Sequence, residues 1–175
     1  IFSYEESYGY MLGDYVRDKD AVTASLVATE MAAWYYDRGM TLYDALQELY
    51  EKYGVYQEKT LNLVMPGLDG LKKMADLMAN LRTKPPVDIA GYPVAEQKDY
   101  KDGSVHCVEC GKDSKMELSG SNVLRYELTD GTSVIVRPSG TEPKVKVYIL
   151  TKGETKESCQ KEIAAIEAWA NALKD

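Results

Sequence analysis

A chain of 175 residues is long enough to form one or two small domains with buried cores. Its formal net charge of −7 argues against a nucleic-acid binder, because no basic face is available to neutralise a polyphosphate backbone. No apolar run approaches the length of a membrane span, no signal peptide is expected, and the three cysteines fit a reducing cytoplasm better than a disulfide framework.

The N-terminal segment is predicted to leave a strand and enter a polar loop. Residues 1–4 have the pattern of a strand end, and the lack of a methionine at this start indicates a native chain that extends further upstream. Residues 5–13 are polar and contain glycine, as loops do. Asp14, Asp18 and Asp20 follow without the glycine turn and closing glutamate of a calcium loop. Asp20 is therefore predicted to cap the next helix rather than to bind a metal.

Periodic apolar residues then predict a helix at 21–37, a helix at 42–53, a strand at 56–64 and a helix at 68–81. The first helix has apolar residues around most of its girth and should be largely buried. Thr41, with Asp44 three residues later, is expected to cap the second helix. Pro85 and Pro86 end this pattern, since proline fixes φ and removes a donor. Residues 83–88 are therefore predicted to link a domain at 1–82 to a domain at 89–175.

The second half of the chain has the pattern of an antiparallel sheet with a helix on it. Strands are predicted at 89–99, 104–109, 122–128, 132–137 and 144–151. The turn at Asp130-Gly131 is a strong hairpin signal. In the last strand Val145, Val147 and Ile149 share one face, which a final helix capped by Thr155 should cover.

The loop Arg137-Pro138-Ser139-Gly140-Thr141-Glu142-Pro143 has the composition of an anion-binding site. Gly140 is expected to let the backbone turn, so that successive N–H groups converge on one point. Ser139 and Thr141 add hydroxyl donors, and Arg137 adds a fork suited to phosphate. The alternative is a tight hairpin connection. The basic residues around the loop, Arg137, Lys144 and Lys146, favour phosphate binding.

The segment His106-Cys107-Val108-Glu109-Cys110 has the spacing of a zinc knuckle or a redox pair. A zinc site needs further ligands, and His106 is the only histidine in the chain. A redox C-x-x-C normally opens a helix, whereas this one lies in strand and turn sequence. The preferred interpretation is two thiols on a hairpin.

Two motifs give the chain a resemblance to a known family. The sequence RPSGTEPKVKVY resembles the phosphate-binding loop of the last domain of the α-D-phosphohexomutases, the phosphoglucomutase and phosphomannomutase family. Residues 4–9 resemble the sugar-binding loop G-E-x-S-G of that family, although Tyr4 replaces its first glycine, and residues 17–20 resemble the charged segment that follows it. The E-E-S-aromatic-G form is nearer to phosphoglucomutases and phosphopentomutases than to bacterial phosphomannomutases. The resemblance covers nearly the whole chain.

The resemblance implies an α/β part-domain, the end of the third domain, at 1–82. An α+β fourth domain with a four-stranded antiparallel sheet covered by helices, TBP-like, would follow. The implied function is the substrate-recognition part of an enzyme that interconverts sugar 1-phosphate and 6-phosphate through a phosphoserine and a bisphosphate. A phosphopentomutase, or a non-catalytic sugar-phosphate-binding module, is the alternative. The implied sugar-binding residues are Glu5, Ser7 and Lys19, and Lys19 can also assist proton transfer. The implied phosphate-binding residues are Arg137, Ser139, Gly140, Thr141 and Lys146. Lys146 stands where phosphoglucomutases often have arginine.

The same resemblance places the chemistry outside this chain. Neither the serine loop nor the aspartate-rich metal loop of the family occurs in the sequence. Mg²⁺ and a glucose 1,6-bisphosphate-type activator are expected in the full-length enzyme. This part of the chain is expected to provide no metal ligand. Lys19, in proton transfer, is the one catalytic residue that it could provide. The expected partners are the phosphosugar substrate and the missing N-terminal domains of the same chain, with no nucleic acid and no membrane. The chain alone is expected to be inactive.

Overall fold

The computed structural model describes residues 2–5 and 8–174, and they form two compact units, Ile1–Tyr53 and Gly54–Asp175. The first unit holds a strand pair, β1 (Phe2–Tyr4) and β2 (Tyr10–Leu12), and two helices, α1 (Ala21–Tyr36) and α2 (Leu42–Tyr53). The second unit holds β3 (Val55–Val64), α3 (Gly70–Thr83), β4 (Asp88–Ile89), β5 (Tyr92–Asp99), β6 (Ser104–Cys107), β7 (Asp113–Lys115), β8 (Leu124–Leu128), β9 (Ser133–Pro138), β10 (Lys144–Gly153) and α4 (Lys156–Ala172). No helix in the described part of the chain has the length and apolar character needed to cross a bilayer.

The helices begin where their sequences predict. The Asp20 carboxylate accepts a hydrogen bond of 2.9 Å from the Val22 amide and so caps α1. Thr41 and Asp44 form a reciprocal capping box at α2, with hydrogen bonds of 2.8 and 3.2 Å. Thr155 caps α4 through the Ser158 amide. These predictions are confirmed because a cap depends only on neighbouring residues.

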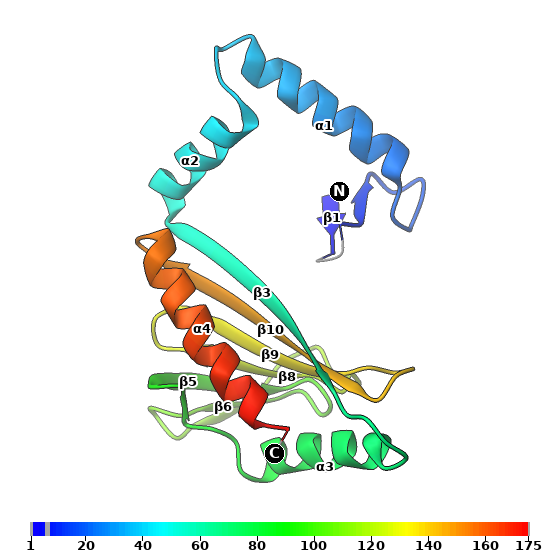
Figure 1. Cartoon of the computed structure of the whole chain (residues 1–175), viewed down its shortest axis with the longest axis vertical. Coiled ribbons are helices and arrows are strands. Elements are labelled where there is room, and N and C mark those ends of the chain that lie inside the picture. The colour runs from blue at the N-terminus through cyan, green and yellow to red at the C-terminus, as the bar shows by residue number, and fades with distance from the viewer. Residues whose placement is uncertain (1, 6–7, 175) are drawn as a thin grey trace. The chain divides into compact units, whose positions relative to one another are not determined.

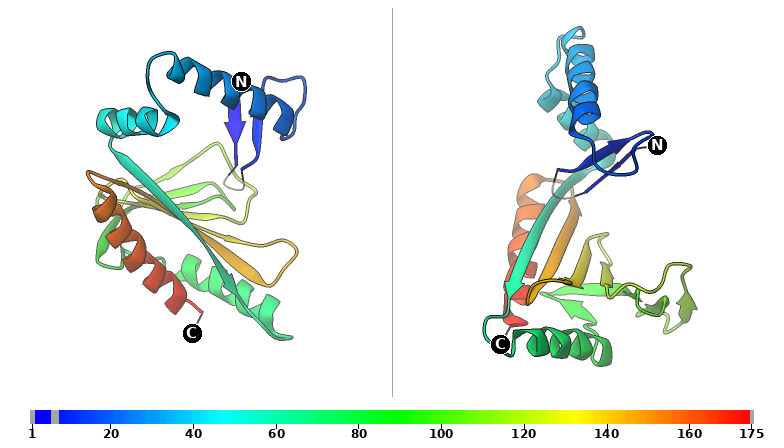
Figure 2. Two further views of the ribbon diagram at one scale, coloured as in Figure 1. Left: turned by 45° about the horizontal axis from the view of Figure 1, so that its top comes forward. Right: turned by 90° about the vertical axis from the view of Figure 1, so that its right-hand side faces the viewer.

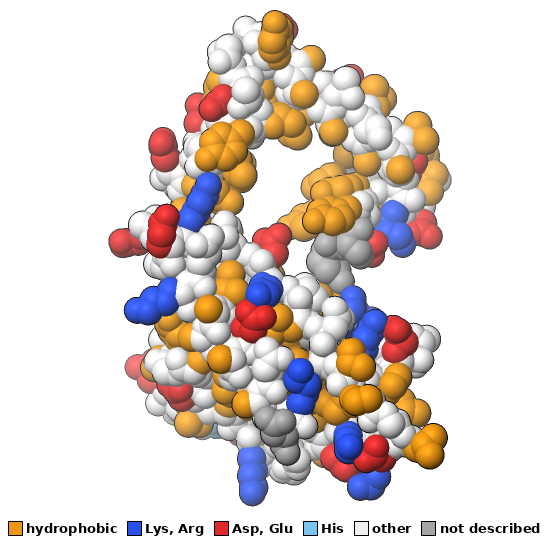
Figure 3. All heavy atoms as spheres, in the orientation of Figure 1, with side chains coloured by type: hydrophobic (Ala, Val, Ile, Leu, Met, Phe, Trp, Pro, Cys, Tyr) orange, Lys and Arg blue, Asp and Glu red, His pale blue; other side chains and the backbone are white. Residues whose placement is uncertain are grey.

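The prediction that the first helix is largely buried is wrong for this chain. Within the described residues α1 has no buried residue, and Val22 and Leu26 are 79% and 60% exposed. Figure 3 shows apolar side chains along the length of α1. The apolar surface of α1 shows which residues a packing partner would bury. No such partner is among the described elements of this unit.

The sheet of the second unit is antiparallel and larger than the predicted four strands. It has eight strands within the described residues, in the order β3-β10-β9-β8-β5-β6-β7, with β4 paired to β5. α4 packs along β3 and β10, whereas β5 to β7 lie toward the other end of the sheet (Figures 1 and 2). The predicted architecture, an antiparallel sheet covered by helices, is confirmed.

The predicted linker at 83–88 is not a domain boundary. β3 pairs with β10 along its whole length, from Val55 opposite Gly153 to Val64 opposite Lys144. β3 and α3 therefore belong to the second unit, and the chain divides between Tyr53 and Gly54. Pro85 and Pro86 end α3 inside that unit. Proline breaks helices and central strands for local reasons, and such a break need not separate domains.

One face of the sheet forms the core with α3 and α4. Val145, Val147 and Ile149 are fully buried, as the alternation of β10 predicts, and they cluster with Met78 of α3 and Ile166 of α4. Lys144, Lys146 and Tyr148 alternate with them and lie on the opposite face. We call this opposite side of the sheet the polar face.

A carboxyl group is buried at the edge of this core. Glu162 of α4 is 6% exposed and interacts with Asp130 and Thr132. Burial, and then the nearby charge of Asp130, raise the pKa of Glu162, with the Thr132 hydroxyl opposing them. Burial and the charges of Glu162 and Asp130 likewise raise the pKa of Tyr92. The folded protein therefore disfavours the ionised form of Glu162.

We expect Glu162→Gln to raise the free energy of unfolding at pH 7 by about 1 kcal/mol, the scale of a poorly satisfied buried polar group. Because the folded-state pKa is raised, the contribution of Glu162 is fully present below its unfolded pKa and is lost as pH rises through the folded value. The variant should therefore gain stability over wild type at neutral pH and little in acid. Urea unfolding at several pH values measures this, with the exposed Glu154→Gln as a control that should follow wild type. Equal pH profiles for wild type and Glu162→Gln would contradict it.

Candidate phosphate-binding and sugar-binding sites

The connection between β9 and β10 is held by hydrogen bonds of its own. The Ser139 amide donates to the Lys144 carbonyl over 2.9 Å, and the Lys144 amide donates to the Glu142 carbonyl over 2.7 Å. The Pro143 carbonyl accepts a 2.8 Å hydrogen bond from Met65, just after β3. Both ends of the loop are therefore fixed to the sheet.

Two consecutive backbone amides of this loop converge on one point. The amides of Thr141 and Glu142 both donate to the Ser139 hydroxyl oxygen, over 3.4 and 3.3 Å. These hydrogen bonds are long, so an anionic oxygen placed in the same position would make shorter and stronger ones. Successive amides directed at one acceptor are the arrangement of a backbone anion site.

The role predicted for Gly140 in turning the backbone is not what the structure shows. Gly140 is not among the glycines with positive φ, and a Cβ built on it would meet no atom within 4 Å. The hydrogen bonds of Ser139 shape the turn instead. Gly140 leaves the approach to the loop open, and its part in binding an anion stays a prediction.

Arg137 and Lys146 lie directly opposite each other on neighbouring strands. Lys146 of β10 pairs in register with Arg137 of β9 on one side and with Asn62 of β3 on the other. Like charges that face each other across strands repel. Within the described residues no carboxylate pairs with the Arg137 guanidinium, whereas the Lys144 ammonium lies 2.5 Å from Glu142. The base of the loop therefore concentrates positive charge on an acidic chain.

The first unit carries a second cluster of polar residues. A pocket of about 190 Å³ is lined by Ser3, Tyr4, Glu5, Gly9, Met11, Asp18 and Lys19. The Lys19 ammonium lies 2.8 Å from the Asp18 carboxylate, and this hydrogen bond, together with the charges of Asp18 and Glu5, raises the pKa of Lys19. Glu5 and Lys19 are thus brought to one pocket. Ser7, the other residue predicted to bind sugar, lies outside the described residues.

Gly9 leaves space for two side chains of this pocket, and its φ is not positive. A Cβ built on Gly9 would collide with the side chains of both Glu5 and Lys19. The close approach of these two side chains therefore depends on the missing Cβ.

The described residues offer no metal centre. No three His, Cys, Asp or Glu side chains in residues 2–5 and 8–174 come together to hold an ion. Asp18 is paired with Lys19, and Asp20 caps α1. A metal expected for the family therefore finds no set of ligands among these residues.

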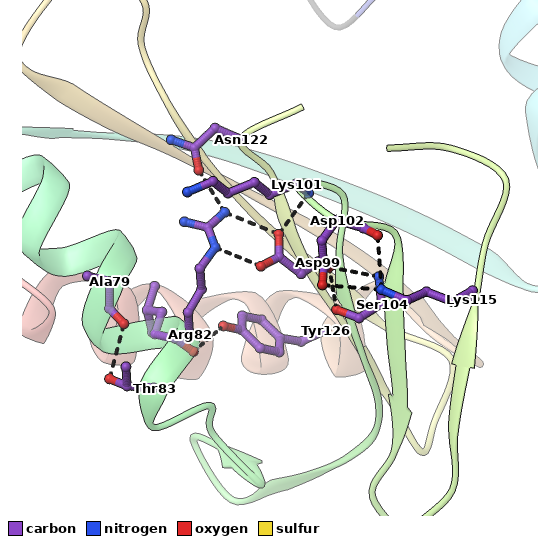
Figure 4. A network of polar contacts seen from close by, with 11 residues as sticks. Ala79, Arg82, Thr83, Asp99, Lys101, Asp102, Ser104, Lys115, Asn122 and Tyr126 are labelled. Atoms are coloured by element: carbon purple, nitrogen blue, oxygen red, sulfur yellow. Dashed lines mark hydrogen bonds and ion pairs between the residues drawn. The ribbon is translucent and has the colours of Figure 1, made fainter. Parts of the chain in front are cut away.

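Sequence reasoning missed a polar network at the end of α3 (Figure 4). The Arg82 guanidinium donates to both carboxylate oxygens of Asp99, over 2.7 and 3.2 Å, and to the Asn122 side chain over 2.7 Å. The Tyr126 hydroxyl donates to the Leu81 carbonyl over 3.5 Å, and burial raises the pKa of Tyr126. These contacts tie α3 to β5 and β8. Residues this far apart in sequence leave no local signal of their pairing.

Comparison with known families agrees with these two units. Residues 61–166 match the family model described as "Phosphoglucomutase/phosphomannomutase, C-terminal domain". Residues 1–53 match "Phosphoglucomutase/phosphomannomutase, alpha/beta/alpha domain III". The chain belongs to the phosphoglucomutase/phosphomannomutase family. The domain III match ends at the residue where the structure also divides the chain.

Individual phosphoglucomutases are similar to the chain over most of its length. That of Staphylococcus aureus (strain N315) is 36% identical over 152 residues, which are 87% of this chain and 27% of the relative. That of Staphylococcus haemolyticus (strain JCSC1435) is 37% identical over 149 residues, 85% of this chain and 27% of the relative. The chain therefore spans about a quarter of the length of these phosphoglucomutases and corresponds to the C-terminal part of one.

A solved structure has the same fold. The exocytosis-sensitive phosphoprotein pp63/parafusin, a phosphoglucomutase from Paramecium in an open form, matches with a TM-score of 0.60 and 16% identity. The match covers 97% of this chain and 29% of that one. At this identity the likeness concerns the fold alone.

Proposed function

We propose that this chain is the substrate-recognition part of a phosphoglucomutase/phosphomannomutase-type enzyme that interconverts sugar 1-phosphate and sugar 6-phosphate. In this proposal the missing N-terminal domains of the same chain, in a cytoplasmic enzyme, supply the phosphoserine and the Mg²⁺ site, and the reaction passes through a bisphosphate of the glucose 1,6-bisphosphate type. The observation that carries the proposal is the apposition of Arg137 and Lys146 beside a loop whose amides converge on one point.

Each residue of the loop has a distinct part in holding the phosphate that is not transferred. The exposed Arg137 would contact two phosphate oxygens with its planar fork, and Lys146 opposite it would add a point charge. The amides of Thr141 and Glu142 would donate to a third oxygen once the Ser139 hydroxyl turns to donate as well. Gly140 would leave room for the anion.

The pocket of the first unit would bind the sugar ring. The Glu5 carboxylate can accept strong hydrogen bonds from sugar hydroxyls, and the Lys19 ammonium can donate to them. Ser7 is assigned to the same role from the sequence motif alone. Since Asp18 holds Lys19 protonated, Lys19 can hold an oxygen or deliver a proton but cannot act as a base without breaking that pair.

A structure with inorganic phosphate or sulfate bound tests the phosphate assignment. The anion should contact the hydroxyls of Ser139 and Thr141 and the guanidinium of Arg137. An anion found only at other sites would contradict the proposal.

The chain of 175 residues by itself should show no conversion of glucose 1-phosphate to glucose 6-phosphate. It lacks the serine loop, and its described residues assemble no metal site. A coupled assay on protein freed of host phosphoglucomutase measures this, with a full-length family member as the positive control. Turnover that copurifies with the 175-residue chain would show that the reaction needs neither missing part.

Substrate choice separates the proposal from its alternatives. The full-length protein should turn over hexose phosphates faster than pentose phosphates. The reverse preference would identify a phosphopentomutase. Binding of sugar phosphate without turnover of either, in the full-length protein, would identify a non-catalytic module.

A further inference from the structure

Cys107 and Cys110 lie in the turn that joins β6 to β7. Cys107 is the last residue of β6, and its backbone closes the turn by two hydrogen bonds of 2.9 Å, donating to Lys112 and accepting from Gly111. Gly111 has a φ of +65°, which suits the left-handed position at the end of such a turn. The backbone that carries Cys107 is therefore fixed to the sheet, while Cys110 lies in the exposed turn.

The two cysteines interact directly through their sulfur atoms and backbone. The Cys110 amide donates to the Cys107 sulfur over 3.2 Å. The hydrogen bond between the thiols, followed by this amide, lowers the pKa of Cys107, and the same thiol contact raises the pKa of Cys110. Cys107 is therefore the thiol of the pair that ionises more readily, and so the better suited to attack a disulfide.

The turn brings the cysteines close to the spacing of a disulfide. A hydrogen bond from residue 111 to residue 107 closes one helix-like turn. Residues three apart in such a turn have Cβ atoms about 5–6 Å apart. A disulfide joins Cβ atoms about 3.5–4.5 Å apart. Cys110 is exposed, so a small movement of the turn closes the difference without disturbing the sheet.

A metal site is the competing interpretation, and the surroundings do not support it. His106 precedes Cys107 in the strand and so points to the other face of the sheet, where its Nδ1 lies 2.7 Å from Asp113. Cys159 is fully buried in α4, with its thiol 3.6 Å from the Val55 carbonyl. Among the described residues no third His, Cys, Asp or Glu joins the two thiols at one point. Two thiols without further ligands are suited to exchange chemistry.

We infer that Cys107 and Cys110 form a redox-active dithiol, a modification site that closes to an intrachain disulfide by exchange with a low-molecular-weight disulfide such as glutathione disulfide. The Cys107 thiolate attacks one sulfur of the external disulfide, forms a mixed disulfide and releases one thiolate, which takes up a proton. The Cys110 thiol then loses its proton and attacks the Cys107 sulfur, releasing the second thiol. The dithiol is oxidised by two electrons, and one external disulfide is reduced to two thiols. This inference does not rest on the proposed function.

The test equilibrates the full chain with reduced and oxidised glutathione at graded ratios. Acid quenching, alkylation of free thiols and peptide mass spectrometry then report the state of each cysteine. As the proportion of oxidised glutathione rises, the peptide that contains Cys107 and Cys110 should lose the mass of two hydrogens. Neither thiol should then react with the alkylating agent. Cys159 should stay reduced and react only after denaturation, and Cys159→Ala should leave the titration of the pair unchanged.

Single variants separate the attacking and resolving thiols. Cys110→Ser should trap glutathione on Cys107 as a stable mixed disulfide. Cys107→Ser should react with glutathione disulfide several-fold more slowly, because it removes the thiol whose thiolate the Cys110 amide stabilises. Both variants should keep the wild-type circular dichroism spectrum, since the turn residues fill no core position.

Several results would overturn the inference. The pair could stay reduced at every ratio, form separate mixed disulfides that never resolve, or join two chains by an intermolecular disulfide. Stoichiometric Zn²⁺ binding that protects both thiols from glutathione disulfide would instead identify a metal site.

Discussion

Replacing Arg137 by alanine in the full-length enzyme should raise KM for the phosphosugar by roughly ten- to a hundredfold. A charge-assisted hydrogen bond contributes about 1.5–3 kcal/mol, and each 1.4 kcal/mol is about a factor of ten in affinity. Arg137 is the residue that would give bidentate contact to the phosphate, and the described residues provide no carboxylate as its partner. Steady-state kinetics with the phosphosugar varied measures the effect, and kcat should also fall if closure over the substrate depends on this contact.

Charge and geometry at this position can be separated. Arg137→Lys should recover only part of the loss, because an ammonium keeps the charge but not the fork. Lys152→Ala is the matched control, since it removes a positive charge from the opposite end of β10. Wild-type KM in Arg137→Ala, or an equal rise in Lys152→Ala, would show that phosphate does not bind at the loop through Arg137.

The position of Arg137 opposite Lys146 also predicts that a bound anion stabilises the protein. Because these cations face each other in register, a phosphate bound between them is attracted by both. Phosphate should therefore stabilise wild type more than Arg137→Ala. The site and the sheet are coupled through this pair.

The sequence predicts what depends on neighbouring residues. The caps at Asp20, Thr41 and Thr155 and the β8–β9 hairpin at Asp130-Gly131 are all confirmed by the structure. A cap needs one side chain and an amide two or three residues away, and the three-residue loop at 129–131 needs a residue such as Gly131 at its end, whose φ is +94°. The alternation in β10 likewise determines which side chains are buried and which reach the polar face.

Predictions that require distant partners are wrong or absent. β3 pairs with a strand some 90 residues later in the chain, for example Val64 with Lys144, and no local pattern identifies that partner. The two consecutive prolines are a clear local signal, whereas the strand pairing leaves none, so the sequence alone predicts the domain boundary at 83–88. The exposed surface of α1 has the same origin, because apolar periodicity does not tell which element provides the cover.

The candidate site also combines features that neighbouring residues determine with features that depend on distant partners. The motif around Ser139 and the charges of Arg137 and Lys146 are visible in sequence, but their direct apposition follows from the strand register. The composition of the loop predicts that the backbone turns at Gly140, whereas in the structure hydrogen bonds to the Ser139 hydroxyl stabilise the turn. No sequence pattern identifies Arg82, Asp99 and Asn122, because their contacts join three separate segments.

Arg82→Ala should lower the free energy of unfolding by about 2–3 kcal/mol. The variant removes a two-point contact with Asp99 and a hydrogen bond to Asn122, and it leaves a partly buried carboxylate without its cation. The side chains of Arg82 and Asp99 are 20% and 19% exposed, so water replaces the lost contact poorly. Loss of helix propensity cannot account for the effect, because alanine is at least as good a helix former as arginine. The midpoint and slope of urea unfolding give the change.

The same helix provides a matched control. Lys72 pairs with Asp76 over 3.1 Å, but these side chains are 80% and 58% exposed, so Lys72→Ala should cost at most about 0.5 kcal/mol. A double-mutant cycle of Arg82→Ala with Asp99→Ala should give a coupling energy of about 1–3 kcal/mol, since the two side chains contact each other directly. If Arg82→Ala costs no more than Lys72→Ala, the network at the end of α3 does not hold this helix to the sheet. If Arg82→Ala lowers the free energy of unfolding by about 2–3 kcal/mol but shows no coupling energy with Asp99→Ala, the stabilising contact of Arg82 is the one with Asn122. Asn122→Ala should then lower the free energy of unfolding by a similar amount.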